Sequence, residues 1–145
     1  MSDKTKQIIG RKEKIDLPEF GLFSIDAKID TGAYTSSIHC SHIVLTEEEG
    51  IEKINFHIPL FNNSESLIKV FQTDQFKIKN IKSSFGQIEK RYVIRTKIRV
   101  AGRLITSDFS LTDRSEMKNP ILIGRKILKN KFLVDVSLFF TNLKA

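Results

Sequence analysis

The chain has 145 residues, of which 24 are Lys or Arg and 17 are Asp or Glu, so its formal net charge is +7. With 40% hydrophobic and 28% charged residues, the composition excludes a disordered chain and predicts one globular domain over residues 8–145, after a flexible N-terminus at 1–7. No apolar run approaches the ~20 residues that cross a bilayer, no secretory signal is recognisable, and the single Cys40 excludes an intramolecular disulfide. We therefore expect a cytoplasmic protein without a membrane partner.

Apolar and polar residues alternate with a period of two from Ile8 onward, which predicts strands rather than helices. The alternation is clear where Ile25, Ala27 and Ile29 occupy one face of a strand that runs straight into Asp30-Thr31-Gly32. An aspartate at a strand end, followed by a small hydroxyl residue and a glycine, suits a tight turn that exposes its carboxylate. By itself, this tripeptide also fits an ordinary turn.

The middle of the chain carries turn signals but no motif that indicates a function. A turn is predicted at residues 46–50, a strand at 53–58 that Pro59 interrupts, and a loop at 62–66. Residues 45–75 match no known pattern, and we expect them only to shape a neighbouring groove.

Two hairpins are predicted in the second half. Residues 76–82 and 87–94 flank Ser83-Ser84-Phe85-Gly86, whose small residues and glycine suit a tight turn. Ala101-Gly102 then joins a long strand to its return strand at 103–111.

The long strand places basic side chains on one face and apolar side chains on the other. The basic face comprises Arg91, Arg95, Lys97 and Arg99. It lacks the interleaved aromatic residues that stack on single-stranded nucleic acid. We therefore expect a solvated face or a surface for an acidic substrate, and we do not expect nucleic acid as a partner.

Helical character is confined to residues 125–131. They follow Ile121-Leu122-Ile123-Gly124, a short apolar run typical of a buried strand. The predicted fold class is therefore mainly β with one short helix near the C-terminus, and strands at close intervals indicate a closed barrel or a sandwich.

Two motifs together resemble a known family. Asp30-Thr31-Gly32-Ala33 after an alternating strand, combined with the late Ile123-Gly124-Arg125, resembles the retropepsins, the single-domain aspartic peptidases of retroviral type. More closely, the chain is similar to a bacterial family of retropepsin-like aspartic peptidases historically labelled ATP-dependent zinc proteases. The matching stretches are residues 9–13, 17–21, 27–39, 83–86, 89–91, 121–125 and 132–135.

The resemblance implies a closed barrel of the acid-protease type with a short C-terminal helix, and Asp30 as the catalytic residue. Aspartic peptidases need two carboxylates about 3 Å apart that share one proton. One acts as general base on a water, while the protonated partner polarises the scissile carbonyl. Because the chain has a single Asp-Thr-Gly, the second carboxylate must be Asp30 of another copy, which makes a homodimer part of the prediction.

Other site residues carry roles that the resemblance also implies. Thr31, Gly32 and Ala33 would shape the catalytic loop, while Ile123 and Gly124 would support it from behind and Arg125 would tie down the following helix. The candidate flap, which would close over an extended peptide, comprises Ser84, Phe85 and Gly86. Viral members carry an acidic residue where Tyr34 follows Ala33 here, so viral substrate preferences are not expected.

The expected partner is a peptide or protein substrate. Members of the family are associated with ligases that add glutamates, which implies a glutamate-rich protein tail. Arg91, Arg95 and Lys97 are the candidate contacts for such an acidic substrate.

His39-Cys40-Ser41-His42 is a second constellation, with His57 as the remaining histidine. Imidazole and thiolate ligate zinc, but adjacent strand residues point to opposite faces. The sequence also contains neither His-Glu-x-x-His nor a glycine-rich phosphate loop. We expect structural histidines, a buried cysteine and no metal or other cofactor, with a zinc site or a Cys40 nucleophile as the alternatives.

The sequence thus predicts an aspartic endopeptidase that activates water with one Asp30 from each subunit of a homodimer. Two functions of other classes compete with it. One is a non-catalytic β-barrel module that binds peptide or RNA, and the other is a metallopeptidase.

Overall fold

The computed structural model describes residues 5–62, 65–82, 86–113 and 119–141, and strands dominate them. The elements in chain order are β1 (Gln7–Ile9), β2 (Lys12–Leu17), the 3-10 turn η1 (Pro18–Phe20), β3 (Leu22–Ile29), β4 (Ser36–His39), β5 (Ser41–Glu48), β6 (Ile51–Asn62), β7 (Glu65–Thr73), β8 (Lys77–Lys82), β9 (Ile88–Val100), β10 (Arg103–Thr112), β11 (Ile121–Ile123), α1 (Arg125–Leu128) and β12 (Phe132–Val134). No helix in the described part of the chain is long and apolar enough to span a membrane.

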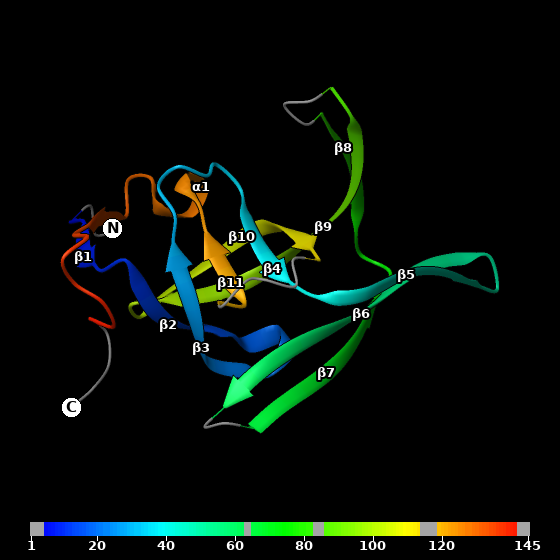
Figure 1. Cartoon of the computed structure of the whole chain (residues 1–145), viewed down its shortest axis with the longest axis horizontal. Helices are drawn as coiled ribbons and strands as arrows, with labels where there is room; N and C mark the ends of the chain where they lie inside the picture. The colour runs from blue at the N-terminus through cyan, green and yellow to red at the C-terminus, as the bar shows by residue number, and fades with distance from the viewer. Residues whose placement is uncertain (1–4, 63–64, 83–85, 114–118, 142–145) are drawn as a thin grey trace.

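A closed six-stranded barrel forms the body of the molecule (Figure 1). The strands are ordered β10-β4-β11-β3-β2-β9, and pairing between β9 and β10 closes the ring. The short β11 lies between β3, to which it is parallel, and β4, to which it is antiparallel. These findings confirm the predicted β-barrel with one short C-terminal helix.

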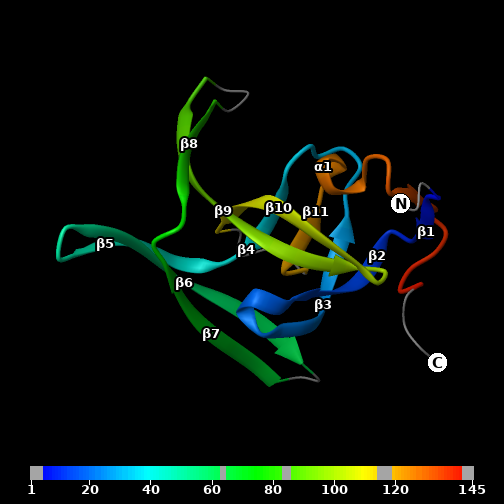
Figure 2. The same cartoon turned by 180° about the vertical axis from the view of Figure 1, so that it is seen from behind.

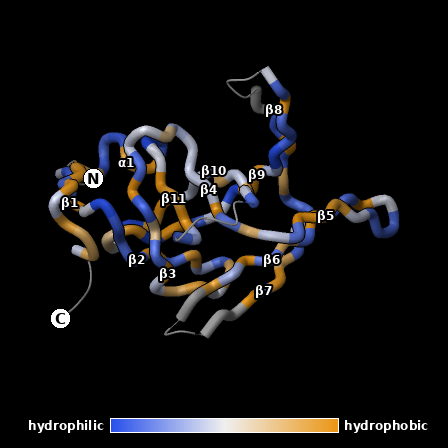
Figure 3. The backbone as a smooth tube through the Cα atoms, in the orientation of Figure 1, coloured by the Kyte–Doolittle hydropathy of each residue, from blue (hydrophilic) through white to orange (hydrophobic). Residues whose placement is uncertain are grey.

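The barrel core follows from the alternation of the strand residues. Ala27, Ile38, Ile98, Phe109 and Ile121 have no exposed surface, and Figure 3 shows apolar and polar positions interspersed along the barrel strands. Full burial of an isoleucine side chain stabilises the fold by about 2 kcal/mol. The strand that leads into Asp30 is therefore anchored by its apolar face.

β5, β6 and β7, which include most of the segment 45–75 that matched no known pattern, form a separate three-stranded sheet (Figure 2). Ile54, Phe56 and Ile58 of β6 are fully buried and belong to the main hydrophobic core. The prediction that Pro59 interrupts β6 is wrong, because Pro59 pairs with Ile68 of β7 inside the strand. Since β5 pairs with β6 only as far as His57, one side of β6 is an open edge there, and an edge tolerates the missing N–H of proline.

Some element boundaries also differ from the predictions. The helix is four residues long rather than spanning 125–131, because Lys129 leaves the helical conformation and Asn130 adopts a left-handed φ of 68°. The turn predicted at 46–50 is confined to Glu49 and Gly50, which have φ values of 52° and 80°. The predicted loop at 62–66 overlaps the strand ends, since β6 ends at Asn62 and β7 begins at Glu65.

The two ends of the chain lie against each other. β1 pairs in parallel with β12, and the N–H of Arg11 donates to the carbonyl of Leu138 at 2.8 Å. The buried carboxylate of Glu13 accepts the N–H of Gly10 at 2.7 Å and the hydroxyl of Thr141. The carbonyl of Arg11, between β1 and β2, also accepts the N–H of Ile29 at the end of β3 at 2.9 Å, which ties this segment to the strand that leads into Asp30.

Candidate active site

Asp30 directly follows β3 and begins a loop that is closed by its own backbone. Its N–H donates to the carbonyl of Ile123 at 2.8 Å, and its carbonyl accepts the N–H of Ala33 at 3.2 Å. The N–H of Gly32 donates to Oδ1 of Asp30 at 3.0 Å. The second oxygen, Oδ2, has no hydrogen-bond donor among the described residues. The half-buried carboxylate is therefore fixed through one oxygen and has the other available for a ligand or a second carboxylate.

The loop rests on the first turn of α1. The N–H of Arg125 donates to the carbonyl of Ala33 at 2.8 Å, and the N–H of Lys126 donates to the carbonyl of Tyr34 at 3.0 Å. Two consecutive carbonyls of the irregular loop thus accept hydrogen bonds from the backbone of α1, and these bonds fix the path of the loop.

Gly124 joins β11 to α1 and touches the loop directly. Its N–H donates to the hydroxyl of Ser36 at 3.0 Å. A Cβ atom at Gly124 would lie 2.7–2.8 Å from the carbonyl oxygens of Ala33, Tyr34 and Thr35. Only glycine permits this approach of β11 to the loop.

Arg125 contacts both ends of the same loop through its side chain. Its Nη1 donates to the carbonyl of Thr31 at 2.9 Å, and its guanidinium carbon lies 5.8 Å from the centre of the Tyr34 ring. Both Arg125 and Tyr34 are exposed. The guanidinium therefore has a fixed position at the surface beside the Asp-Thr-Gly turn.

The structure brings together all of the residues predicted to form and support the catalytic loop. They are Asp30, Thr31, Gly32, Ala33, Ile123, Gly124 and Arg125. Their functional roles stay predictions.

The predicted flap lies on the hairpin of β8 and β9, in which Lys82 pairs with Ile88. Gly86 is exposed and has a left-handed φ of 82°, which suits a turn, whereas Ser84 and Phe85 lie outside the described residues. Figures 1 and 2 show that the hairpin projects from the barrel at the same end as the loop after β3. Its placement suits a segment that faces this loop.

Comparison with known proteins identifies the family. A family model described as RimB-like, retropepsin-like aspartic endopeptidase RimB, matches residues 8–145. The chain belongs to this family. The resemblance found in the sequence is thereby confirmed.

Similar proteins have a different name and are much longer. The chain is 40% identical over 137 residues to a probable alpha-L-glutamate ligase of Shewanella halifaxensis, which covers 94% of this chain and 30% of the relative. A protein of the same name from Desulfotalea psychrophila is 32% identical over 137 residues, covering 94% of this chain and 29% of the relative. The chain thus spans about 30% of the length of the curated relatives it matches.

A solved structure shares the fold of this chain over most of its length. A Legionella pneumophila protein of unknown function superposes with a TM-score of 0.73 at 28% sequence identity. The match covers 96% of this chain and 100% of that one.

The three predicted contacts for an acidic substrate each lie beside a carboxylate of the protein itself. Arg91 pairs with Glu89, with 3.2 Å between Nη2 and Oε2. Arg95 pairs with Asp108 at 3.2 Å. The backbone N–H of Lys97 donates to Oε1 of Glu19, whose pKa is lowered by this hydrogen bond and by another from Thr96. The role of Arg91, Arg95 and Lys97 in substrate binding stays a prediction.

Asp108 joins β10 to α1, because it pairs with Lys126 at 3.3 Å as well as with Arg95. Partial burial acts to raise the pKa of Asp108, but the hydrogen bonds from Lys126 and Arg95 outweigh it and hold the pKa below 3.8. A carboxylate whose pKa is lowered on folding stabilises the fold above its unfolded pKa and loses that contribution as the pH falls through the folded pKa.

We therefore expect Asp108→Asn to lower the free energy of unfolding by about 1 kcal/mol at pH 7. The difference from the wild type should shrink as the pH falls below 3.8. Urea titrations at several pH values measure it, with Asp74→Asn, an exposed aspartate between β7 and β8, as the control. A loss that grows on acidification would contradict this account.

The histidines and the cysteine of the second constellation do not all come together at one point. Cys40 is fully buried with Sγ 3.6 Å from the carbonyl of Ile38, and His39 is also buried. The rings of His42 and His57 stack, with centroids 4.8 Å apart. In the described ranges, no group of three or more His, Cys, Asp and Glu side chains gathers in a way that could hold a metal ion.

Cys40 is poorly suited to act as a nucleophile. Burial, together with the negative charge of Asp113, raises the pKa of its thiol to about 12. Since the thiolate is the reactive form, we expect Cys40→Ala to keep full peptide cleavage while lowering the free energy of unfolding by about 1 kcal/mol. Activity assays beside denaturant titrations test this. Loss of cleavage in a folded variant would revive the thiol alternative.

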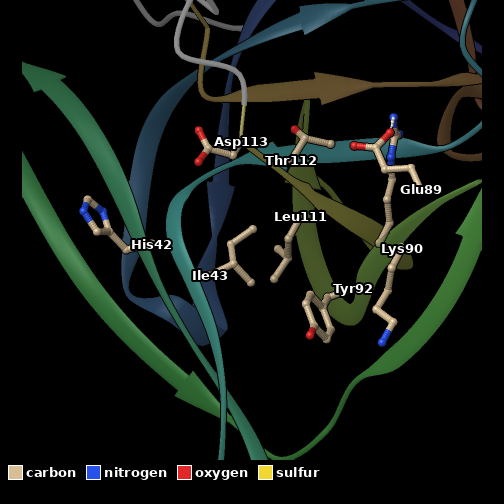
Figure 4. Close-up of a pocket in the computed structure, with 9 residues that line it drawn as sticks. His42, Ile43, Glu89, Lys90, Tyr92, Leu111, Thr112 and Asp113 are labelled. Atoms are coloured by element: carbon tan, nitrogen blue, oxygen red, sulfur yellow. Dashed lines mark hydrogen bonds and ion pairs between the residues drawn. The ribbon is translucent and has the colours of Figure 1, made fainter. Parts of the chain in front are cut away.

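A cavity of about 440 Å³ lies between β5, β9 and the end of β10 (Figure 4). Ile43, Tyr92 and Leu111 form the apolar part of its lining, and Glu89 and Asp113 add carboxylates to it. No residue of the Asp30 loop lines it. Residues 89–92 of β9 line the cavity, so it adjoins the predicted flap hairpin.

Two residues at the candidate site were not predicted to support it. Ser36 binds Gly124, and Tyr34 stacks against Arg125. The sequence signal for Ser36 was a small hydroxyl residue at an otherwise buried strand position, where a polar group needs a partner.

Proposed function

We propose that this protein is an aspartic endopeptidase that works as a homodimer with one Asp30 from each subunit. The observation that carries the proposal is the geometry of Asp30. In a chain of an aspartic endopeptidase family, its carboxylate is held by the N–H of Gly32 on a loop supported by β11 and α1. Such support keeps a catalytic group in one orientation.

The chemistry requires a second copy of the chain. Two carboxylates in contact share a proton, so that one activates water and the other polarises the scissile carbonyl. The chain has one Asp-Thr-Gly, so a symmetric pair of loops supplies the dyad. The exposed Thr31 hydroxyl has no hydrogen-bond partner among the described residues, which suits a contact with the other loop.

The substrate in this proposal is an extended peptide lying between the Asp30 loop and the β8–β9 hairpin, with glutamate-rich protein tails as the favoured class. The longer relatives named probable alpha-L-glutamate ligase support this choice, because in them the matched region is part of a protein named for adding glutamate. Removal of glutamates is the hydrolytic counterpart of that reaction.

The test is cleavage of a mixed peptide library that includes Glu-rich members, by the wild type and by Asp30→Asn, each with and without EDTA. We expect cleavage by the wild type in both conditions and none by the variant. Cleavage that survives Asp30→Asn but stops in EDTA would favour a metallopeptidase. A protein that binds peptides tightly and cleaves none would favour the binding module.

A further inference from the structure

Arg125 is an exposed cation beside the candidate catalytic turn, and no carboxylate among the described residues pairs with it. Of its five N–H donors, one is used by the carbonyl of Thr31. The Tyr34 ring, at 5.8 Å, holds the guanidinium without satisfying any donor. Several donors of a positioned guanidinium are therefore available beside Asp30.

Three other cations of the protein, in contrast, form ion pairs with carboxylates. Lys126, the next residue of α1, pairs with Asp108, as does Arg95. Arg91 pairs with Glu89. The protein's own carboxylates thus pair with these three cations, whereas Arg125, next to the Asp-Thr-Gly turn, has no such partner among the described residues.

We propose that Arg125 is a specificity-determining residue that binds a carboxylate of the substrate close to the scissile bond. This inference rests on the proposed peptide groove at Asp30. A planar guanidinium forms two parallel hydrogen bonds with a carboxylate, and these charge-assisted bonds are stronger than neutral ones. Because Thr31 and Tyr34 already fix the side chain, binding a carboxylate costs little additional ordering of Arg125.

The hydrogen bond from Arg125 to Thr31 links the proposed carboxylate-binding residue to the Asp30 turn. Arg125 contacts the carbonyl of the residue that follows Asp30, so a substrate carboxylate seated on Arg125 has a defined position relative to the catalytic turn. An acidic side chain, or the terminal carboxylate of a chain, then sets which peptide bond faces Asp30. The neutral amide of Gln has the same shape but lacks the charge, and it binds more weakly.

The test compares kcat/KM for matched peptides that differ only in Glu or Gln near the cleaved bond. We expect the wild type to prefer the Glu peptide by about tenfold or more. Arg125→Gln should bring the ratio close to one, and Arg125→Lys should keep part of it, because a lysine retains the charge without the fork. Arg125→Glu should favour a Lys peptide instead.

A purely structural role of Arg125 would lower the rates for both peptides equally and leave the ratio unchanged, and that result would overturn the proposal. Arg103→Gln is the matched control. Arg103 also donates to a carbonyl, that of Thr5 at 2.8 Å, and also stacks on a ring, that of Phe132 at 5.7 Å, but it lies at the turn between β9 and β10. The ratio should be unaffected by Arg103→Gln, and an equal loss there would contradict a specific role for Arg125.

A binding experiment separates this proposal from the proposed function. Fluorescently labelled oligo-Glu and oligo-Gln peptides are titrated with Asp30→Asn and with the double variant Asp30→Asn/Arg125→Gln. Preference for oligo-Glu that disappears in the double variant supports the role of Arg125, even if the wild type cleaves nothing and the peptidase proposal fails. Equal binding of both peptides by Asp30→Asn would overturn the role of Arg125, whether or not the wild type cleaves.

Discussion

Asp30→Asn is expected to lower kcat for peptide cleavage by about 10³-fold or more, with no change of fold. An asparagine oxygen still accepts the N–H of Gly32, so the turn is preserved. An amide, however, neither takes a proton from water nor shares one with a partner carboxylate. Steady-state kinetics measure the loss, and circular dichroism with denaturant titration checks that the variant is folded.

The matched control is Asp74→Asn, which removes an exposed carboxylate between β7 and β8. Its kcat should equal that of the wild type. Full activity in Asp30→Asn, or an equal loss in Asp74→Asn, would show that Asp30 has no special role in hydrolysis.

Gly124→Ala is expected to lower both the stability and the activity of the protein. Its new Cβ would lie 2.7–2.8 Å from three loop carbonyls, so β11 and the Asp30 loop must separate. Overpacking of this kind lowers the free energy of unfolding by about 3 kcal/mol. Because the loop carries Asp30, we also expect peptide cleavage to fall at temperatures where the variant is still folded.

Gly50→Ala is the control for this substitution. A Cβ atom added at Gly50 would meet no other atom within 4 Å, but the φ of +80° at this position disfavours alanine. The expected loss is about 1 kcal/mol, with unchanged cleavage. Urea titrations compare the two variants, and a Gly124→Ala protein as stable as the wild type would refute the close packing of Gly124 against the Asp30 loop.

Local patterns were sufficient to predict much of the fold. The alternation of Ile25, Ala27 and Ile29 predicted β3, and the apolar run at 121–123 predicted β11. Both patterns are set by burial of one or both strand faces, which neighbouring residues encode directly. The boundaries failed where single residues decide, as at Asn130, whose left-handed conformation follows the end of α1.

Tertiary contacts account for what could not be predicted. The β5-β6-β7 sheet was missed because nothing in its sequence shows that Phe56 packs into the barrel core. The contact of Arg125 with Thr31 joins residues 94 positions apart, so neighbouring residues do not encode it, and the role of Arg125 in tying down the helix stays a prediction. In the part of the chain that the structure describes, Arg125 has no acidic partner, and its proposed role depends on this property of the folded arrangement, which the sequence does not display.

Mixing of subunits tests the shared dyad most directly. Limiting wild-type protein is equilibrated with a growing excess of Asp30→Asn, and cleavage is measured per wild-type chain. If each active site needs Asp30 from both subunits, a tenfold excess of the variant should lower this activity about tenfold, because most wild-type chains then have an inactive partner. Activity per wild-type chain that stays constant, with subunit exchange verified by a labelled variant, would contradict a dyad formed by two copies of Asp30.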